Sequence, residues 1–165
     1  METGEKKVYQ RAMRLLARRN HSRLELHHKL VRTHPSELVE EILDRLEEKG
    51  FLNDENFALE RALLGRERRL WGDLRVFQDL KNFGIDAKMI EQILEQVNRK
   101  KEEVESLQEA IDLWVNKSGE PQTPSPLKKL FDHCVRLGYA PHTVRQQLGP
   151  YFDHIDWSRK DENRR

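Results

Sequence analysis

The chain has 165 residues, a net charge of +1, and equal shares, 36% each, of hydrophobic and charged residues. Its single cysteine excludes an internal disulfide, and no apolar stretch is long enough to cross a bilayer. The opening residues Met1–Lys7 lack the hydrophobic segment of a signal peptide, so we expect a cytoplasmic location.

Hydrophobic residues recur at helical spacing in a pattern that is written three times, which predicts an all-α protein of tandem three-helix repeats. At an offset of 50 residues, the aligned positions of the first two copies are Leu24 with Leu74, Leu26 with Val76, and Leu30 with Leu80. A weaker third copy follows at an offset of 54, which aligns Leu137-Gly138 with Phe83-Gly84. The predicted repeats cover 7–50, 51–100 and 101–157, with a charged tail over 158–165. A mean hydropathy of −0.88 favours stacked modules in an elongated chain over one compact globule.

The starts of several helices are marked by capping residues. Ser22 and Glu25 have the spacing of a capping box, in which the serine oxygen accepts from the Glu25 amide and the Glu25 carboxylate reaches back to the Ser22 amide. A second start is predicted in each repeat from N-cap or first-turn residues. These are Ser36, Asp86 and, in the third copy, Ala140 followed by Pro141.

Glycine and proline mark the helix ends. Gly50 and Gly84 stand where helices are expected to stop, because glycine readily adopts the left-handed conformation that ends a helix. Three prolines between Gly119 and Pro126 disfavour helix, so the sequence predicts a loop over 119–126 inside the third repeat.

Charge is segregated along the chain although it nearly cancels overall. From Arg11 to Arg32 seven basic residues face one acid, Glu25, whereas the segment 37–60 is dominated by Asp and Glu. The second repeat has part of the same order, with basic residues over 61–81. Such runs are explained equally by a solvated helix face and by a binding surface that recurs at one repeat position.

No recognised catalytic, metal or nucleotide site is found in the sequence. The adjacent pairs His27-His28 and His133-Cys134 point about 100° apart on a helix, which does not suit one metal ion. Cys134 aligns with Leu30 and Leu80 and is predicted to be a core residue rather than a nucleophile. No phosphate-binding glycine motif is present, so we expect no catalytic residue, metal or cofactor.

Most aromatic residues lie on the apolar helical stripes and are predicted to be core residues. They are Phe57, Phe77, Phe83, Trp114 and Phe131. Trp71, beside Gly72 at a predicted helix junction, is interpreted as a partly buried residue that closes a three-helix repeat, with nucleic-acid stacking as the alternative.

Four blocks in a fixed order resemble the signature blocks of the RecX family. The first runs from Leu15 to Leu30 and contains Leu-Leu-Ala-Arg-Arg followed by Ser22 and Glu25-Leu26; the second includes Gly-Phe-Leu-Asn-Asp over 50–54 and Phe57-Ala58. The others are 71–75 and 80–85. The resemblance covers nearly the whole chain, but the third repeat departs from it through its proline-rich insertion and Ala140.

The resemblance implies a bacterial regulator of the RecA recombinase, with a role in recombination, DNA repair and the SOS response, that is not itself an enzyme. It implies tandem three-helix repeats that curve into an elongated arc. Proteins of this family bind in the groove of the RecA filament on single-stranded DNA and hinder its growth or promote its disassembly. They thereby lower ATP hydrolysis, strand exchange and co-protease activity. We therefore expect the filament as partner, with possible auxiliary DNA contact, and a monomer that needs neither membrane nor cofactor.

The expected contact surface consists of the basic residues of the first two repeats, because complementary charge speeds association and fixes register. The predicted contact residues are Arg18, Arg19, Arg23, Lys29, Arg32, Arg66, Arg68, Arg69 and Arg75. The alternative is a helical module that acts directly on single- or double-stranded DNA, since three-helix units resemble helix-turn-helix domains. The near-zero net charge and the acidic third helix count against that alternative.

Overall fold

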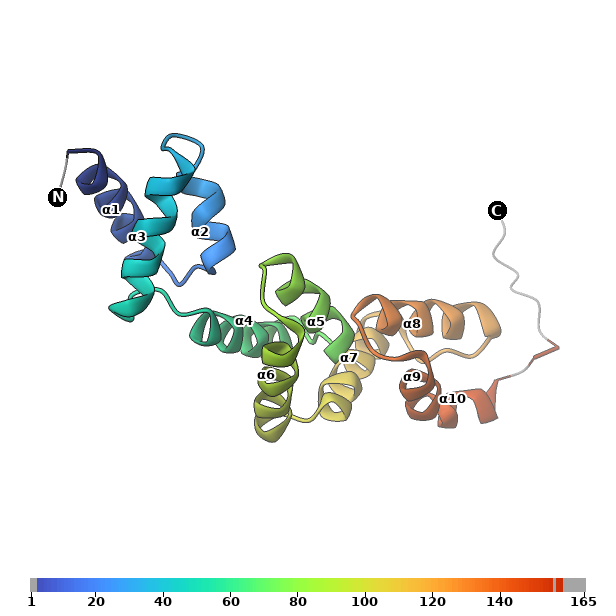
Figure 1. Ribbon diagram of the computed structural model, residues 1–165. Coiled ribbons are helices and arrows are strands. Elements are labelled where there is room, and N and C mark those ends of the chain that lie inside the picture. The colour runs from blue at the N-terminus through green and yellow to red at the C-terminus, as the bar shows by residue number, and fades with distance from the viewer. Residues whose placement is uncertain (1–2, 156, 159–165) are drawn as a thin grey trace. The chain divides into compact units, whose positions relative to one another are not determined.

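A computed structural model describes residues 3–155 and 157–158. The predicted tail over 158–165 lies outside the described residues except for Ser158. The helices found are α1 (Thr3–Leu16), α2 (Arg23–Leu30), α3 (Ser36–Glu48), α4 (Asp54–Arg68), α5 (Asp73–Asn82), α6 (Ala87–Lys100), α7 (Glu103–Ser118), α8 (Pro124–Arg136), α9 (Pro141–Gln147) and α10 (Gly149–His154) (Figure 1). No strand occurs within 3–155 and 157–158, so the all-α prediction is confirmed.

The helices divide between two compact units. One unit contains the described residues up to Ala62 together with Asp79–Ile93, and the other contains Leu63–Gln78 together with the described residues from Leu94 onward. The division passes through α4, α5 and α6, which form the second of the three predicted repeats. The three-repeat boundaries stay a prediction.

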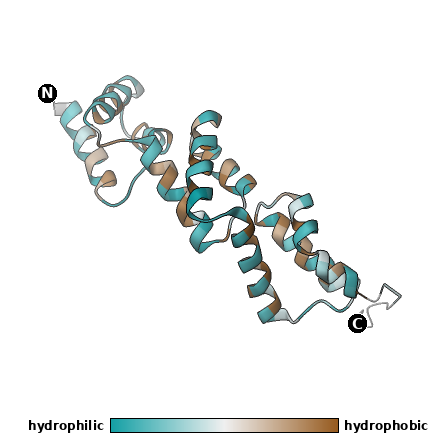
Figure 2. Ribbon diagram, turned by 90° about the horizontal axis from the view of Figure 1, so that it is seen from below, coloured by the Kyte–Doolittle hydropathy of each residue, from teal (hydrophilic) through white to brown (hydrophobic). Residues whose placement is uncertain are grey.

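Each unit contains a continuous hydrophobic core built from helices that are hydrophobic on one side, as the interleaved brown and teal residues of Figure 2 show. In the first unit α1, α2 and α3 supply Val8, Ala12, Leu26, Leu30, Val39, Ile42, Leu43 and Leu46. In the second unit α7, α8 and α9 supply Leu107, Ile111, Leu127, Leu130, Cys134 and Val144, which Tyr139, Leu148 and Ile155 complete. Leu30, Leu80 and Cys134, equivalent in the repeat alignment, are all fully buried, which confirms the predicted stripe.

Close approaches at glycines recur at equivalent positions. In the first unit, a Cβ atom at Gly84, before α6, would lie 2.8 Å from the Cβ of Leu24 at the start of α2. In the second unit, a Cβ atom at Gly138, before α9, would clash with the Cβ of Arg75 at the start of α5. Both glycines have positive φ, 81° and 96°. The turn of one repeat therefore packs against the second helix of the preceding repeat, and only glycine leaves the necessary room.

A second contact between consecutive repeats is a side-chain cap that the sequence analysis missed. The backbone N–H of Arg23, at the start of α2, donates to the Asp54 carboxylate at 2.7 Å. The backbone N–H of Asp73, at the start of α5, donates to the Glu103 carboxylate at 2.8 Å. Asp54 and Glu103 are the first residues of α4 and α7, so the first helix of each following repeat caps the second helix of the preceding repeat.

Several predicted helix ends are confirmed. The Glu25 amide donates to the Ser22 hydroxyl at 3.1 Å, and the Met89 amide donates to the Asp86 carboxylate at 3.1 Å. α9 begins at Pro141 after Ala140, as predicted. Gly50 follows the end of α3 with a φ of 72°, as expected for a left-handed terminator.

Three local predictions are wrong. Ser36 is the first residue of α3 rather than its cap, because the helix already starts with the Val39 amide donating to the Pro35 carbonyl. The loop predicted over 119–126 is shorter, since α8 begins at Pro124 and proline fits the first turn of a helix, where no amide donor is needed. The predicted third helix of the last repeat is divided into α9 and α10.

The aromatic core prediction is correct only in part. Phe57 is buried, whereas Phe77, Phe83, Trp114 and Phe131 are half-buried. Phe83 packs against Phe57 and also lies under the Arg61 guanidinium, whose carbon is 4.1 Å from the ring centroid. The apolar stripes therefore include residues at the edge of the core. One of them, Phe83, packs against a buried ring on one side and an arginine side chain on the other.

Candidate interaction surface

In the first unit, Arg19 and Lys29 are held by one acidic side chain. The Arg19 guanidinium pairs with the Glu25 carboxylate, and the Lys29 ammonium lies 2.9 Å from the same carboxylate. Burial alone would raise the pKa of Glu25, but the hydrogen bonds from Arg19 and Lys29 outweigh it and hold that pKa at about 2. The acid predicted to complete a capping box therefore anchors two basic residues of the predicted contact surface.

Arg23 is also paired within its own unit. Its guanidinium lies 2.5 Å from Glu40, 2.7 Å from Asp44 and 2.7 Å from Glu47, all on α3. These acids belong to the segment that the sequence analysis treated as a separate acidic surface. The two charge runs thus meet across α2 and α3, and part of the segregated charge is neutralised inside the first unit.

Arg18 and Arg32 differ from their neighbours because both are exposed and neither has an ion-pair partner among the residues described. Arg18 follows the end of α1, and Arg32 follows the end of α2. A cation near the last turn of a helix interacts favourably with the exposed carbonyl groups there, yet remains available to a partner. Of the five basic residues predicted in this unit, these two are the ones that an external anion would meet without first displacing an acidic side chain of the described chain.

Arg66 contradicts the prediction of an exposed contact residue, because its side chain is fully buried. Its guanidinium pairs with the Asp73 carboxylate and lies 3.2 Å from the Asn98 side-chain oxygen, joining α4, α5 and α6 inside the second unit. The basic run around it gave no sign of this burial. A fully buried arginine is unusual unless paired, and this pairing assigns Arg66 to the architecture of the unit rather than to its surface.

Arg68, Arg69 and Arg75 are exposed, and two of them contact Trp71. The guanidinium carbons of Arg69 and Arg75 each lie 4.9 Å from the Trp71 ring centroid. Arg75 also donates to the Arg136 carbonyl at 2.8 Å. Trp71 itself is only 8% exposed, which confirms its interpretation as a packed residue. The two arginines are therefore held in place by the ring, a preorganisation that lowers the entropy lost on binding.

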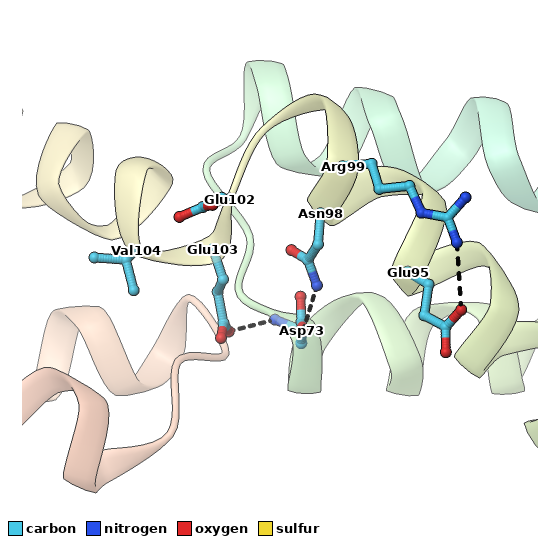
Figure 3. A pocket seen from close by; sticks show the side chains of 7 residues that line it. All are labelled: Asp73, Glu95, Asn98, Arg99, Glu102, Glu103 and Val104. Atoms are coloured by element: carbon cyan, nitrogen blue, oxygen red, sulfur yellow. Dashed lines mark hydrogen bonds and ion pairs between the residues drawn. The ribbon is translucent and has the colours of Figure 1, made fainter.

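An open pocket in the second unit is acidic rather than basic, and the sequence analysis did not anticipate it (Figure 3). It is lined by Asp73, Glu95, Asn98, Arg99, Glu102, Glu103 and Val104. Its central groups point toward one another: Asn98 donates to the Asp73 carboxylate at 3.1 Å, and the Asp73 amide donates to Glu103. Burial raises the pKa of Glu103 despite that hydrogen bond. These contacts hold the start of α5 and the Arg66 pair in place.

Cys134 is fully buried, as its position in the repeat predicted. Burial raises the pKa of the Cys134 thiol to about 11, so the thiolate needed for nucleophilic attack is disfavoured. In the part of the chain that the structure describes, no three His, Cys, Asp or Glu side chains cluster as metal ligands would. Within the same residues, no helix combines the length and apolar character needed to cross a membrane.

Solved structures share this fold. A crystal structure of RecX from Lactobacillus salivarius superposes with a TM-score of 0.76 at 19% identity and covers 90% of this chain and 97% of its own. A second crystal structure, of a regulatory protein RecX, gives a TM-score of 0.75 at 21% identity, with 89% and 72% covered.

Sequence comparison identifies the family. Residues 9–46, within α1 to α3, match the family model described as RecX, first three-helix domain. The regulatory protein RecX of Pseudomonas entomophila (strain L48) is 38% identical over 120 residues, which cover 71% of this chain and 74% of that protein. The regulatory protein RecX of Chlorobium phaeobacteroides (strain BS1) is 29% identical over 153 residues, with 92% and 97% covered. This chain therefore belongs to the RecX family.

Proposed function

We propose that this chain regulates the RecA recombinase by binding its filament on single-stranded DNA, and that it lowers RecA activity without being an enzyme itself. The observation that carries the proposal is its similarity, over 74% of the length of the Pseudomonas entomophila protein, to a regulatory protein RecX. Binding to RecA follows from the resemblance of the signature blocks in the sequence. The fold supports the proposal, because the exposed basic residues Arg18, Arg32 and Arg68 lie at or just after helix ends, where a partner can reach them.

The exposed arginines support a charged contact surface. Arg18, Arg32 and Arg68 have no ion-pair partner among the described residues, and Arg69 and Arg75 are held against Trp71. Their guanidinium groups can form paired hydrogen bonds with carboxylates or phosphates. We assign them the principal contacts. Arg19, Arg23 and Lys29 contribute less, because each would first have to leave an acidic partner in its own unit.

The proposal is tested by measuring ATP hydrolysis by RecA on single-stranded DNA with rising amounts of this chain. We expect the hydrolysis rate to fall. Inhibition by far less than one chain per RecA subunit would indicate action at filament ends or on nucleation. Unchanged hydrolysis at equimolar chain would contradict the proposal.

The contact residues are tested by charge reversal of Arg18, Arg32 and Arg68 to Glu in one variant. Because all three are exposed and unpaired in the described chain, the variant should stay folded and helical, and its melting temperature should fall only modestly through the lost interaction with the helix-end carbonyl groups, while inhibition weakens about tenfold or more. The matched control reverses Lys88, Lys129 and Arg145, which are also exposed and have no ion pair within the described residues. If both variants inhibited RecA equally, the assignment of Arg18, Arg32 and Arg68 as contact residues would be wrong.

Direct action on DNA is the second candidate, because the same unpaired arginines could neutralise phosphates. It predicts tight binding of naked single-stranded DNA that weakens steeply with salt and accounts for inhibition through competition with RecA. The two functions are distinguished by first assembling RecA on single-stranded DNA and then adding the chain. Inhibition is measured with and without an excess of naked single-stranded DNA as competitor. Inhibition that disappears in excess naked DNA would favour the second candidate.

A further inference from the structure

A groove in the second unit combines basic and apolar groups and includes two arginines of the proposed contact surface, Arg68 and Arg69. It lies between the end of α4, the second half of α7 and the end of α8. We call its basic lining residues Arg68, Arg69 and Lys117 the rim, and its apolar lining residues Leu113, Trp114 and Leu137 the floor. No carboxylate belongs to the lining.

The apolar floor is partly accessible to solvent, although most of it belongs to a helix that packs against the core. Leu113 is 57% exposed on α7, although Ala110 and Ile111 on the same helix are buried. Trp114 and Leu137 are half-buried beside it. A large aliphatic side chain left in water next to other apolar groups costs free energy that a bound apolar group would recover. The floor is therefore suited to one large hydrophobic side chain.

The rim determines the charge of the occupant. Arg68 and Lys117 are exposed and have no ion-pair partner among the described residues, while Arg69 is positioned by Trp71. The lining holds the cations Arg68, Arg69 and Lys117 and no carboxylate, and Asp132, next to the lining residue His133, is already paired with Lys128 at 2.6 Å. The field at the groove is thus positive, and complementary groups on an occupant would be carboxylates.

We propose that this groove binds an acidic peptide segment of a partner protein, with one large apolar side chain of the segment seated on Leu113 and Trp114 and its flanking carboxylates paired with Arg68, Arg69 and Lys117. A peptide is favoured over single-stranded DNA because base stacking needs an open aromatic face. Trp114, the aromatic residue of the lining, is half-buried, and the most exposed residue of the floor is the aliphatic Leu113. The inference does not depend on RecA and goes beyond the proposed function.

The test uses the full chain and a short fluorescein-labelled peptide in which a leucine–phenylalanine pair is flanked on both sides by glutamates. Fluorescence anisotropy should show saturable binding. Replacing the leucine–phenylalanine pair by two serines should abolish it. Trp114 lies in the groove, so peptide binding should also change tryptophan emission in the wild type but not in Trp114→Phe.

Matched variants locate the site. Leu113→Ser and Lys117→Glu should each weaken peptide binding about tenfold, equivalent to about 1.4 kcal/mol. Leu74→Ser and Arg145→Glu should leave it unchanged, since Leu74 is as exposed as Leu113, at 58%, and Arg145 is an exposed cation outside the groove. All four positions are on the surface, and circular dichroism verifies that each variant is folded.

Three results would overturn the inference: no binding of the peptide by the wild type, equal binding by Leu113→Ser and Lys117→Glu, or binding of oligothymidylate but not of the peptide at these residues. Self-association of the chain that is lost in Leu113→Ser without peptide binding would assign the groove to a second copy instead. The peptide assay contains neither RecA nor DNA. Its failure therefore leaves the outcome of the ATPase experiment standing.

Discussion

At the scale of single residues, the same side-chain type takes three different roles among the predicted contact residues. Arg66 is buried, Arg23 binds three acids of α3, and Arg68 is exposed. Spacing along the sequence does not separate these roles, because all three lie in basic runs. What separates them is whether a carboxylate from another helix reaches the guanidinium, and that depends on how the helices pack.

The burial of Arg66 leads to a stability prediction. Arg66→Ala should lower the free energy of unfolding by about 3–5 kcal/mol, because it leaves the partly buried Asp73 carboxylate without its cation and empties a buried volume. Arg68→Ala, two residues away and exposed, should change it by less than about 0.5 kcal/mol. Urea denaturation followed by circular dichroism gives both values. Similar losses for the two variants would contradict the placement of Arg66.

The ion pairs of Glu25 lead to a pH prediction. Because the pKa of Glu25 is about 2 in the folded chain against 4.5 ordinarily, its ionised form contributes stability that is complete above pH 4.5 and is lost as pH falls toward 2. Glu25→Gln should remove this contribution, so the variant should be less stable than the wild type at pH 7 and should lose less stability between pH 5 and pH 3. Urea denaturation at each pH measures the difference, with the exposed Glu41→Gln as control. Parallel pH dependence of Glu25→Gln and wild type would refute this role.

At the scale of helices, the sequence predicted most of the fold. The periodicity of the hydrophobic residues and the capping residues predict most helix positions correctly. They do so because Ser22, Asp86 and Gly50 interact with neighbours only a few residues away along the chain. The contacts between consecutive repeats were missed, since the Asp54 and Glu103 caps join residues about 30 positions apart. Their signal was present, as an acidic residue begins the first helix of the second and third repeats, but an acid at a helix start is explained equally well by the helix dipole.

The glycine contacts give a prediction at the same scale. Gly138→Ala and Gly50→Ala both place an alanine at positive φ, but only the Cβ atom at 138 would meet a neighbour, since the space at Gly50 is open. Gly138→Ala should therefore lower the free energy of unfolding by about 1–3 kcal/mol more than Gly50→Ala. Thermal or urea denaturation of the two variants provides the comparison. Equal losses would mean that backbone strain alone, and not close packing against Arg75, requires the glycine.

At the scale of the whole molecule, the net charge is near zero, but some charged side chains are paired with one another and others are not. Pairs such as Arg23 with the acids of α3 satisfy each other within one unit, while Arg18, Arg32 and Arg68 stay exposed and unpaired in the described chain. The sequence identified the basic residues as a group, but it did not show which of them lack an ion-pair partner and can contact another molecule. Availability depends on side-chain pairing across helices, and that information is absent from a run of charges read along the chain.

The central proposal, recognition of the RecA filament, is tested most directly by a binding measurement. RecA is assembled on single-stranded DNA with a slowly hydrolysed ATP analogue, and fluorescently labelled chain is titrated at physiological salt. The proposal predicts saturable binding to the filament that is clearly tighter than binding to the same DNA without RecA and to RecA without DNA. Binding to naked DNA as tight as to the filament, or no binding to the filament, would contradict it.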